Sequence, residues 1–345
     1  MRTEQLLPDQ MGMARAAILL AAGEVVAIPT ETVYGLAGDA RNGRAVARIY
    51  QAKGRPSFNP LIVHVPDLDT ARTIADLPPE AEALAAAFWP GALTLVLPLR
   101  PDAGIASLVT AGLPTIAIRL PAHPVAQALL RLTGPLAAPS ANASGRISPT
   151  SAAHVLDPDG GLEGRISAVL DAGPCPVGLE STIVGWPQGR ATLLRPGGIP
   201  AEAIADALGQ PLDAHKADPA APNAPGQLTS HYAPNAPLRL NAADPAPGET
   251  HVAFAAPGPF TLSETGDLTQ AAARLFDILR RADREGRPIA VAPVPDHGLG
   301  AAINDRLRRA AAPRHRVFSV AEIPRGESEG RGAAPPRPPH NPSEP

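Results

Sequence analysis

The sequence predicts an α/β protein with two domains, a larger one built on a twisted mixed sheet with flanking helices and a smaller Rossmann-like one. Over residues 1–209, short apolar runs bounded by glycine and proline alternate with stretches of helical periodicity. A proline-rich linker over 210–236 interrupts this pattern, and a strand–helix–strand–helix order begins again over 237–323. With 345 residues the chain is long enough for two domains. Residues 324–345 form a proline-rich tail with the composition of a disordered segment.

The first half of the larger domain alternates helices and short strands, and most boundaries have a local signal. Gly23 ends the first helix, and Pro29 ends the strand that follows it. Asn42 is the N-cap of the second helix, and Pro79 occupies the first turn of the fourth. Helices are predicted over 11–23, 42–52, 67–77 and 79–88, and strands over 25–28, 61–65 and 93–97.

The second half of this domain continues in the same way. Ser148 and Pro149 form a typical N-cap and N1 pair, and Gly209 ends the last helix. Strands are predicted over 115–120, 136–138, 168–170, 182–184 and 192–194, and helices over 123–132, 148–156 and 200–208.

In the smaller domain, the order of elements predicts parallel strands. Strands are expected over 251–255, 289–292 and 317–320, and helices over 269–285 and 301–311. The last helix carries three arginines, Arg306, Arg308 and Arg309. A solvated helix face is the ordinary interpretation of such a charge run, and a surface for a partner or for RNA is the alternative.

Composition excludes several classes of function. The net charge of −3 gives no global basic field for nucleic acid, and 3% aromatic residues argue against a base-stacking surface. A single cysteine, Cys175, excludes an internal disulfide framework and a cysteine-based zinc site, and it fits a reducing cytosol. The apolar run over 16–22 is too short to span a bilayer, so we expect a cytoplasmic protein without a membrane contact.

Lys53 and Arg55 stand two residues apart in a loop that glycine and proline keep out of regular helix. An apolar run that contains His64 follows and predicts a buried strand. A stiff loop that presents an ammonium and a planar guanidinium at a strand edge suits phosphate oxygens. On its own, however, this pattern is also typical of a solvated basic loop.

Further polar loops stand at the ends of predicted strands, over 30–34, 140–148 and 179–182. Each alone is ordinary, because Ser, Asn, Gly and Pro are the usual turn formers. Together they bring cations and hydroxyl groups to loops of one sheet, as an anionic ligand such as a phosphate ester requires. The cations are Lys53, Arg55, Arg119 and Arg195, and the hydroxyl groups are those of Thr30, Thr115, Ser140, Ser148 and Ser181.

The common nucleotide and hydrolase signatures are missing from the sequence. It has no Gly-x-x-x-x-Gly-Lys-Ser/Thr motif, and no Gly-x-Gly-x-x-Gly follows a strand. It also has no His-Glu-x-x-His motif and no Gly-x-Ser-x-Gly elbow. A nucleotide would therefore be bound in another way.

The order of these motifs resembles the YrdC-like family in its long, two-domain form. The matching segments are PTETVYGL (29–36), KGRP (53–56) with NPLIVH (59–64), WPGALT (89–94), PSANASG (139–145) and LESTI (179–183). Lys53, Arg55, Ser140 and Asn142 match the family's diagnostic Lys-x-Arg and Ser-x-Asn set. The resemblance is dense over about 10–205, and it resumes at PGQL (225–228) and SHYAP (230–234), a linker motif of the long form.

The resemblance implies an L-threonylcarbamoyladenylate synthase, a nucleotidyltransferase that uses L-threonine, bicarbonate and ATP and releases pyrophosphate. The product would serve N6-threonylcarbamoyladenosine formation beside the anticodon of tRNA. The implied partners are downstream tRNA threonylcarbamoyl-transfer proteins, with a weak tRNA contact as a further option. The chemistry needs positioning and positive charge more than a covalent nucleophile. Mg2+ would contribute, held mainly by the ATP phosphates.

Matching positions carry the implied site residues. Lys53 and Arg55 would stabilise the transferred phosphate and are the implied catalytic residues. L-Threonine would be held by Thr30, His64, Arg119 and Ser181. ATP would be bound by Lys53, Arg55, Asn59, Thr115, Ser140, Asn142, Ser148, Arg195 and Tyr232. Tyr232 would act as a lid that excludes water from a labile mixed anhydride.

This function has three alternatives. A YrdC-like RNA-binding module without adenylate synthesis disagrees with the net charge of −3. A carbamoyl-transferring maturation factor would need Cys-x-x-Cys zinc motifs, which one cysteine cannot form. A paralogue without adenylate synthesis would lack the Lys-x-Arg and Ser-x-Asn residues that this chain has.

Overall fold

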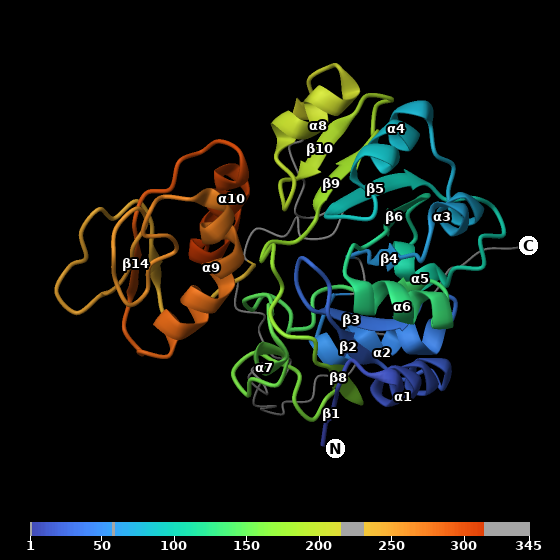
Figure 1. Ribbon diagram of the computed structural model, residues 1–345, viewed down its shortest axis with the longest axis horizontal. Coiled ribbons are helices and arrows are strands. Elements are labelled where there is room, and N and C mark those ends of the chain that lie inside the picture. Colours follow the sequence, from blue (N-terminus) through green and yellow to red (C-terminus); the bar gives the residue numbers. More distant parts are fainter. Residues whose placement is uncertain (1, 57–58, 215–230, 314–345) are drawn as a thin grey trace, which may run out of the picture. The chain divides into compact units, whose positions relative to one another are not determined.

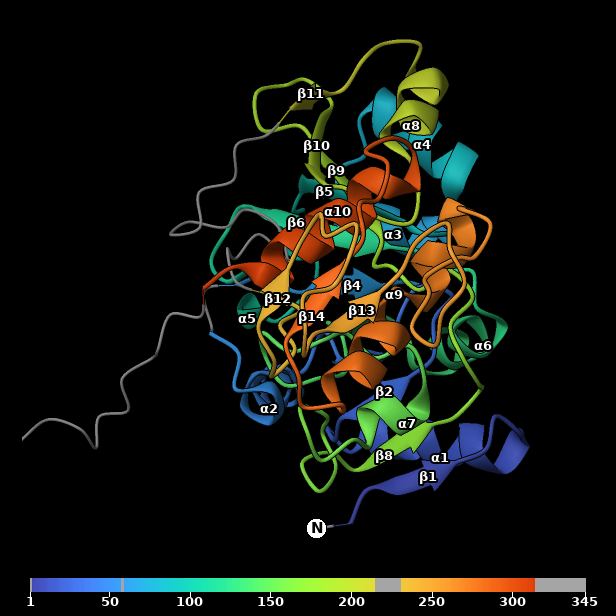
Figure 2. The same cartoon turned by 90° about the vertical axis from the view of Figure 1, so that its left-hand side faces the viewer.

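An eleven-stranded mixed sheet organises the larger part of the computed structural model (Figure 1). The structure describes residues 2–56, 59–214 and 231–313. The strand order is β1-β8-β2-β3-β7-β4-β6-β5-β9-β10-β11, so β1 and β11 are the two edges, which lie at opposite ends in Figure 2. The strands are β1 Glu4–Leu6, β2 Val26–Ile28, β3 Gly35–Asp39, β4 Ile62–His64, β5 Leu93–Pro98, β6 Thr115–Arg119, β7 Leu136–Ala137, β8 Ala168–Leu170, β9 Thr182–Gly185, β10 Thr192–Arg195 and β11 Asp213–Ala214.

The sheet combines both kinds of strand pairing. β4 and β6 run parallel, as do β5 and β9, whereas β5 and β6 are antiparallel. The helices of this part are α1 Gln10–Ala21, α2 Gly43–Lys53, α3 Leu68–Ile74, α4 Pro79–Phe88, α5 Ser107–Thr110, α6 Pro124–Thr133, α7 Ala152–Val155 and α8 Ala201–Leu208. The predicted α/β class with a mixed sheet and flanking helices is confirmed.

Alternation along the strands separates a packed face from the face that carries the polar side chains. In β4, Val63 packs into the main apolar core, whereas Ile62 and His64 point to the other face. β6 lies beside β4 in register, with Ile62 opposite Ala117 and His64 opposite Arg119. His64 and Arg119 are therefore cross-strand neighbours on one face at the carboxyl ends of two parallel strands.

A second, three-stranded parallel sheet with the order β12-β14-β13 lies in residues 238–291. Its elements are β12 Leu238–Arg239, β13 Thr250–Val252, α9 Leu268–Asp283, β14 Ile289–Val291 and α10 Leu299–Ala311. Asp267 caps α9 by accepting from the N–H groups of Thr269 and Gln270. The β13–α9–β14–α10 order confirms the small Rossmann-like unit.

The structure differs from the predicted elements in a few places. β3 occupies 35–39, whereas the sequence predicts a loop at its first two residues, and no sequence signal predicts the short elements β1, α5, β11 and β12. The helix predicted over 148–156 is limited to α7, and its N-cap is Ser151 rather than Ser148. The Ser148 hydroxyl is instead bonded to the Glu180 carboxylate, at 2.5 Å.

Some predictions concern residues outside those described. The strand at 317–320, the tail at 324–345 and the PGQL segment are among them. The boundaries at 209, 236 and 323 stay predictions. Within the described ranges, no helix has the length and apolar character needed to cross a membrane.

Candidate active site

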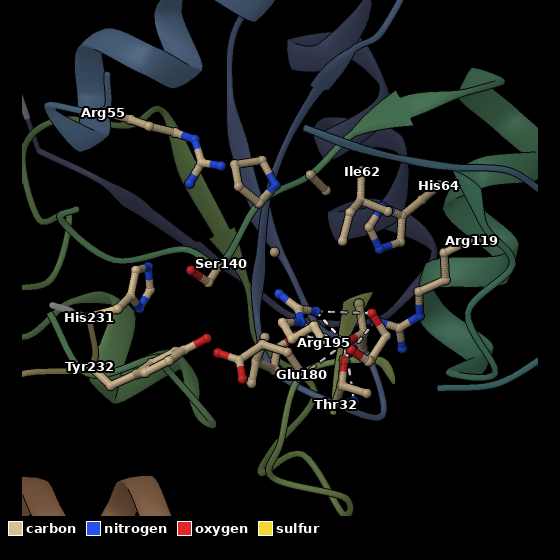
Figure 3. A pocket seen from close by; sticks show the side chains of 16 residues that line it. Thr32, Arg55, Ile62, His64, Arg119, Ser140, Glu180, Arg195, His231 and Tyr232 are labelled. Carbon is tan, nitrogen blue, oxygen red and sulfur yellow. Dashed lines mark hydrogen bonds between the residues drawn. The ribbon is translucent and has the colours of Figure 1, made fainter. Parts of the chain in front are cut away.

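A cavity with an empty volume of about 560 Å³ lies over the polar face of the sheet, at the ends of β4 and β6 (Figure 3). Loops that follow β2, α2 and β7 close around it, together with the loop before β9, the end of β10 and the segment that precedes β12. It is lined by Thr30, Thr32, Val33, Gly35, Arg55, Ile62, His64, Arg119, Ala138, Pro139, Ser140, Glu180, Ser181, Arg195, His231 and Tyr232.

The structure brings most of the predicted site residues together around this cavity. Eight of them line it, namely Thr30, Arg55, His64, Arg119, Ser140, Ser181, Arg195 and Tyr232. Lys53, Asn59, Asn142 and Ser148 are buried behind the lining. Thr115 begins β6 and lies on the same face as Arg119, about 13 Å away along the strand.

Arg119 is fixed by contacts from each of its nitrogens. Nη2 donates to Glu31 Oε1 at 2.6 Å, Nη1 to Thr32 Oγ1 at 2.8 Å, and Nε to the Gly91 carbonyl at 3.1 Å. Burial raises the pKa of the Glu31 carboxyl, but the Arg119 guanidinium overcomes this and holds that pKa below its ordinary value. Arg119 is thus held in a fixed orientation, and its planar guanidinium suits a carboxylate ligand.

His64 lies beside Arg119 as a neutral imidazole. Burial, and then the nearby Arg119 charge, lower the pKa of His64 to about 3. Its Nδ1 is buried and meets no hydrogen-bond partner among the residues that the structure describes. A buried polar nitrogen of this kind is available to a ligand.

The two basic residues of this loop, Lys53 and Arg55, lie at different depths below the cavity surface. Arg55 lines the cavity and donates to the carbonyls of Asn59 and Pro60, the latter at 2.9 Å. Burial, with Arg195 adding to it, lowers the pKa of Arg55 to about 10, so Arg55 is charged at neutral pH. Lys53 reaches instead under the loop after β7, where Nζ donates to the carbonyls of Ser140 and Asn142. Lys53 therefore fixes the loop that presents Ser140.

Ser181 and Arg195 form a joined pair at the ends of β9 and β10. Arg195 Nη2 donates to the Ser181 carbonyl at 2.8 Å, and the Ser181 hydroxyl is bonded to the Thr94 hydroxyl at 2.7 Å. The Gly198 N–H donates to the Glu180 carbonyl at 2.9 Å and ties the following turn to the same segment. These bonds hold a hydroxyl group and a cation on one wall.

Tyr232 closes the wall nearest the small domain. It stacks on Phe276 of α9 with ring centres 5.5 Å apart, and the edge of His231 meets it at 4.1 Å. Its backbone has φ +63°, in the left-handed region, and its hydroxyl points toward the cavity in Figure 3. The side chain is buried, and its role as a lid stays a prediction.

Three polar lining residues were not identified from the sequence: Thr32, Glu180 and His231. Each is within two residues of a predicted one in a matching motif, and this adjacency was the available signal. Thr30 Oγ1 is bonded to Thr32 Oγ1 at 2.8 Å, which joins the two threonines into one turn. Burial lowers the pKa of His231 to about 3, so it is a second neutral imidazole at the cavity.

The chain matches known proteins over almost all of its described length. Residues 18–197 match the Sua5/YciO/YrdC family, described as "Telomere recombination", and residues 199–312 match the C-terminal domain of threonylcarbamoyl-AMP synthase. The chain is 42% identical to threonylcarbamoyl-AMP synthase of Bacillus subtilis, over 90% of this chain and 96% of that protein. It is 40% identical to the Pyrococcus abyssi enzyme of the same name, over 88% and 95%. The crystal structure of P. abyssi Sua5 complexed with L-threonine superposes with a TM-score of 0.82 at 36% identity, covering 90% of this chain and 98% of that one.

Proposed function

The chain belongs to the Sua5/YciO/YrdC family, and we propose that it joins L-threonine, bicarbonate and ATP into threonylcarbamoyl-AMP and pyrophosphate. Its relatives of known name identify it as an enzyme that transfers an adenylyl group, a nucleotidyltransferase. The threonine amine would combine with bicarbonate to give a carbamate and water. A carbamate oxygen would then attack the α-phosphorus of ATP, and pyrophosphate would leave.

One observation supports this proposal most strongly: a single cavity has two chemically different ends. In Figure 3, His64 and Arg119 lie on one side of the view, and Arg55, His231 and Tyr232 lie on the other. The first end offers a fixed guanidinium and a neutral imidazole, as an amino acid carboxylate and its neighbouring groups require. The second offers a guanidinium, a neutral imidazole and the Tyr232 hydroxyl, polar groups that suit the phosphates and base of a nucleotide.

The residues between the two ends would stabilise the charge that develops on the transferred phosphate. Arg195 and the Ser140 hydroxyl line this middle part, and Lys53 orders the Ser140 loop from below. Preorganised cations and donors stabilise a phosphoryl transition state without reorganising during the reaction. Lys53 and Arg55 would in this way act on the phosphates, Lys53 by positioning the loop and Arg55 directly.

Mg2+ is proposed as an ion that arrives with ATP. The parts of the chain that the structure describes hold no group of three or more His, Cys, Asp or Glu side chains able to bind a metal. Both Glu180 oxygens are already bonded. An ion bound through phosphates needs few protein ligands, so we propose that Mg2+ is held by the triphosphate. We propose the cytoplasm as the compartment, where these substrates and tRNA occur, and downstream threonylcarbamoyl-transfer proteins as consumers of the product.

The test is pyrophosphate release by the purified full-length chain, with each substrate omitted in turn, and mass detection of the threonylcarbamoyl-AMP product. Release should require ATP, bicarbonate and L-threonine together. Arg119→Lys should raise the KM for L-threonine by about tenfold or more, because an ammonium cannot replace the planar guanidinium proposed to bind the carboxylate, with little change in the KM for ATP. Arg55→Lys should instead raise the KM for ATP and leave the KM for L-threonine little changed. Arg100→Lys, at an exposed position, is the matched control.

Release that does not depend on threonine would contradict the proposal and indicate another acceptor or a hydrolase. A folded chain that binds RNA and releases no pyrophosphate would favour the binding-module alternative.

A further inference from the structure

Glu180 is chemically out of place in a cavity proposed for a triphosphate. Among the described residues that line this cavity, it is the one acidic side chain, and the lining also includes the cations Arg55, Arg119 and Arg195. A carboxylate at an anion site repels the ligand unless another charge neutralises it. The source of that neutralising charge therefore bears directly on nucleotide binding.

The counter-charge comes from α10 of the C-terminal domain. Arg306 is completely buried, with 0% exposure, and its Nε donates to Glu180 Oε2 at 2.8 Å. Glu180 Oε1 accepts from the Ser148 hydroxyl at 2.5 Å, so both carboxylate oxygens are engaged. Burial raises the pKa of the Glu180 carboxyl, but Arg306 and then Arg195 hold that pKa at about 2. Glu180 is therefore ionised, and Arg306 neutralises its negative charge.

Arg306 also contacts the surroundings of two other nucleotide-side residues. Its Nη2 donates to the Pro196 carbonyl at 2.9 Å, directly after Arg195. Its guanidinium lies over the Tyr232 ring, 5.2 Å from the ring centre. Its Nη1 donates to Asp305 Oδ2 at 2.6 Å, which fixes the guanidinium plane. One side chain thus supports Glu180, the Arg195 turn and the Tyr232 ring.

We infer that Arg306 is a positioning residue of the nucleotide site, through which the C-terminal domain neutralises Glu180 and orients Arg195 and Tyr232. This inference rests on the proposed function, because it assigns ATP to the end of the cavity that these residues line. It gives the C-terminal domain a specific role in the reaction of the catalytic domain. Arg306 itself does not line the cavity and is not assigned a contact with substrate.

Loss of Arg306 should harm ATP binding more than threonine binding. The Glu180 carboxylate would keep its charge near the phosphates without a partner, and Tyr232 would lose the cation on its face. The Arg119 and His64 end has its own contacts and does not depend on α10. A merely structural role would instead lower the active fraction and leave both KM values unchanged.

The experiment measures KM for ATP and for L-threonine, together with ATP affinity by calorimetry, in full-length variants whose folding is checked by circular dichroism. Arg306→Met should raise the KM and Kd for ATP by about tenfold or more and change the KM for threonine less than about twofold. The double variant Arg306→Met with Glu180→Gln should regain part of the ATP affinity, because the unpaired charge is gone. The KM and Kd for ATP of Arg306→Lys should lie between those of wild type and Arg306→Met.

Arg308→Met is the matched control, because Arg308 is exposed on the same helix two residues away. It should leave both KM values at the wild-type level. Equal rises in the two KM values, or unchanged values in Arg306→Met, would overturn the inference, as would a double variant no better than the single one. If wild type itself neither binds ATP nor releases pyrophosphate, the proposed function fails first, and the two failures are distinguishable.

Discussion

His64 and His231 show how burial decides the chemistry of a single side chain. Both imidazoles are neutral, because burial lowers each pKa to about 3. In the unfolded chain a histidine titrates near pH 6.5. The unfolded state therefore binds more protons than the folded state between these two values, and folding stability falls as the pH drops below about 6.5.

The difference between the folded and unfolded histidine pKa values predicts that the protein loses stability in mild acid, at pH values where carboxylates are still ionised. From pH 7 to pH 5, each of the two histidines should remove about 2 kcal/mol from the free energy of unfolding. His64→Asn carries no titrating group, so its unfolding free energy should fall by about 2 kcal/mol less over the same interval. Urea unfolding at the two pH values, in wild type and variant, measures this difference. An equal loss in both proteins would show that His64 is protonated in the folded state.

For individual residues, the sequence predicts which ones lie near the cavity but not how deeply each one is buried. Eight of the thirteen site residues predicted from matching motifs line one cavity. Lys53, by contrast, holds a loop from behind, because its Nζ donates to two backbone carbonyls. Among the arginines of the last helix, only side-chain burial distinguishes Arg306, which is buried, from Arg308, which is exposed. Burial depends on packing between distant segments, and a helical charge run carries no such information.

Elements with strong local signals were predicted well, and those fixed by distant partners were not. α2 has its Asn42 cap and an apolar stripe, and β4 has an apolar run after prolines. β3, with the sequence GLAGD, has low strand propensity and forms because β2 and β7 pair with it on either side. α7 is short because the Ser148 hydroxyl bonds Glu180 and the cap moves to Ser151.

The turn after β10 gives a prediction for backbone packing. A Cβ on Gly197 would lie 2.4 Å from the Glu180 carbonyl oxygen and equally close to the Ser181 and Thr182 backbone. Gly197→Ala should therefore push this turn away from β9 and lower the free energy of unfolding by about 1–3 kcal/mol. Because Arg195 stands two residues before Gly197, at the end of β10, the KM for ATP should rise as well.

Gly43→Ala is a suitable comparison in the first turn of α2. The nearest atom to a Cβ there is 3.9 Å away, so the new methyl group fits. This variant should be stabilised by about 0.4 kcal/mol, because the unfolded chain loses freedom. Chemical denaturation of both variants should show that the free energy of unfolding falls in Gly197→Ala and rises in Gly43→Ala. A Gly197→Ala protein as stable as wild type would contradict the tight packing.

For the molecule as a whole, one cluster of buried apolar side chains contains residues of both the small domain and the catalytic domain. Val33, Ile147 and Leu179 belong to the same cluster of buried side chains as Phe276 and other residues of α9. A Cβ on Gly178 would lie 2.4 Å from the Ala272 carbonyl oxygen of α9, so the two backbones are in direct contact there. With the buried pair of Glu180 and Arg306, these contacts predict that the two domains unfold together.

Two probes can test this coupling, because both tryptophans, Trp89 and Trp186, lie in the catalytic domain. Tryptophan fluorescence reports that domain, and amide exchange of α9 followed by mass spectrometry reports the other. In wild type the two transitions should coincide in denaturant, whereas Arg306→Met should shift the α9 transition to a lower concentration and separate them. Removing one partner of a buried ion pair costs about 3–5 kcal/mol, most of it because the remaining charge stays buried without compensation. Two separate transitions in wild type would mean that the shared core does not couple the domains, and Arg306 would then act locally on the nucleotide site.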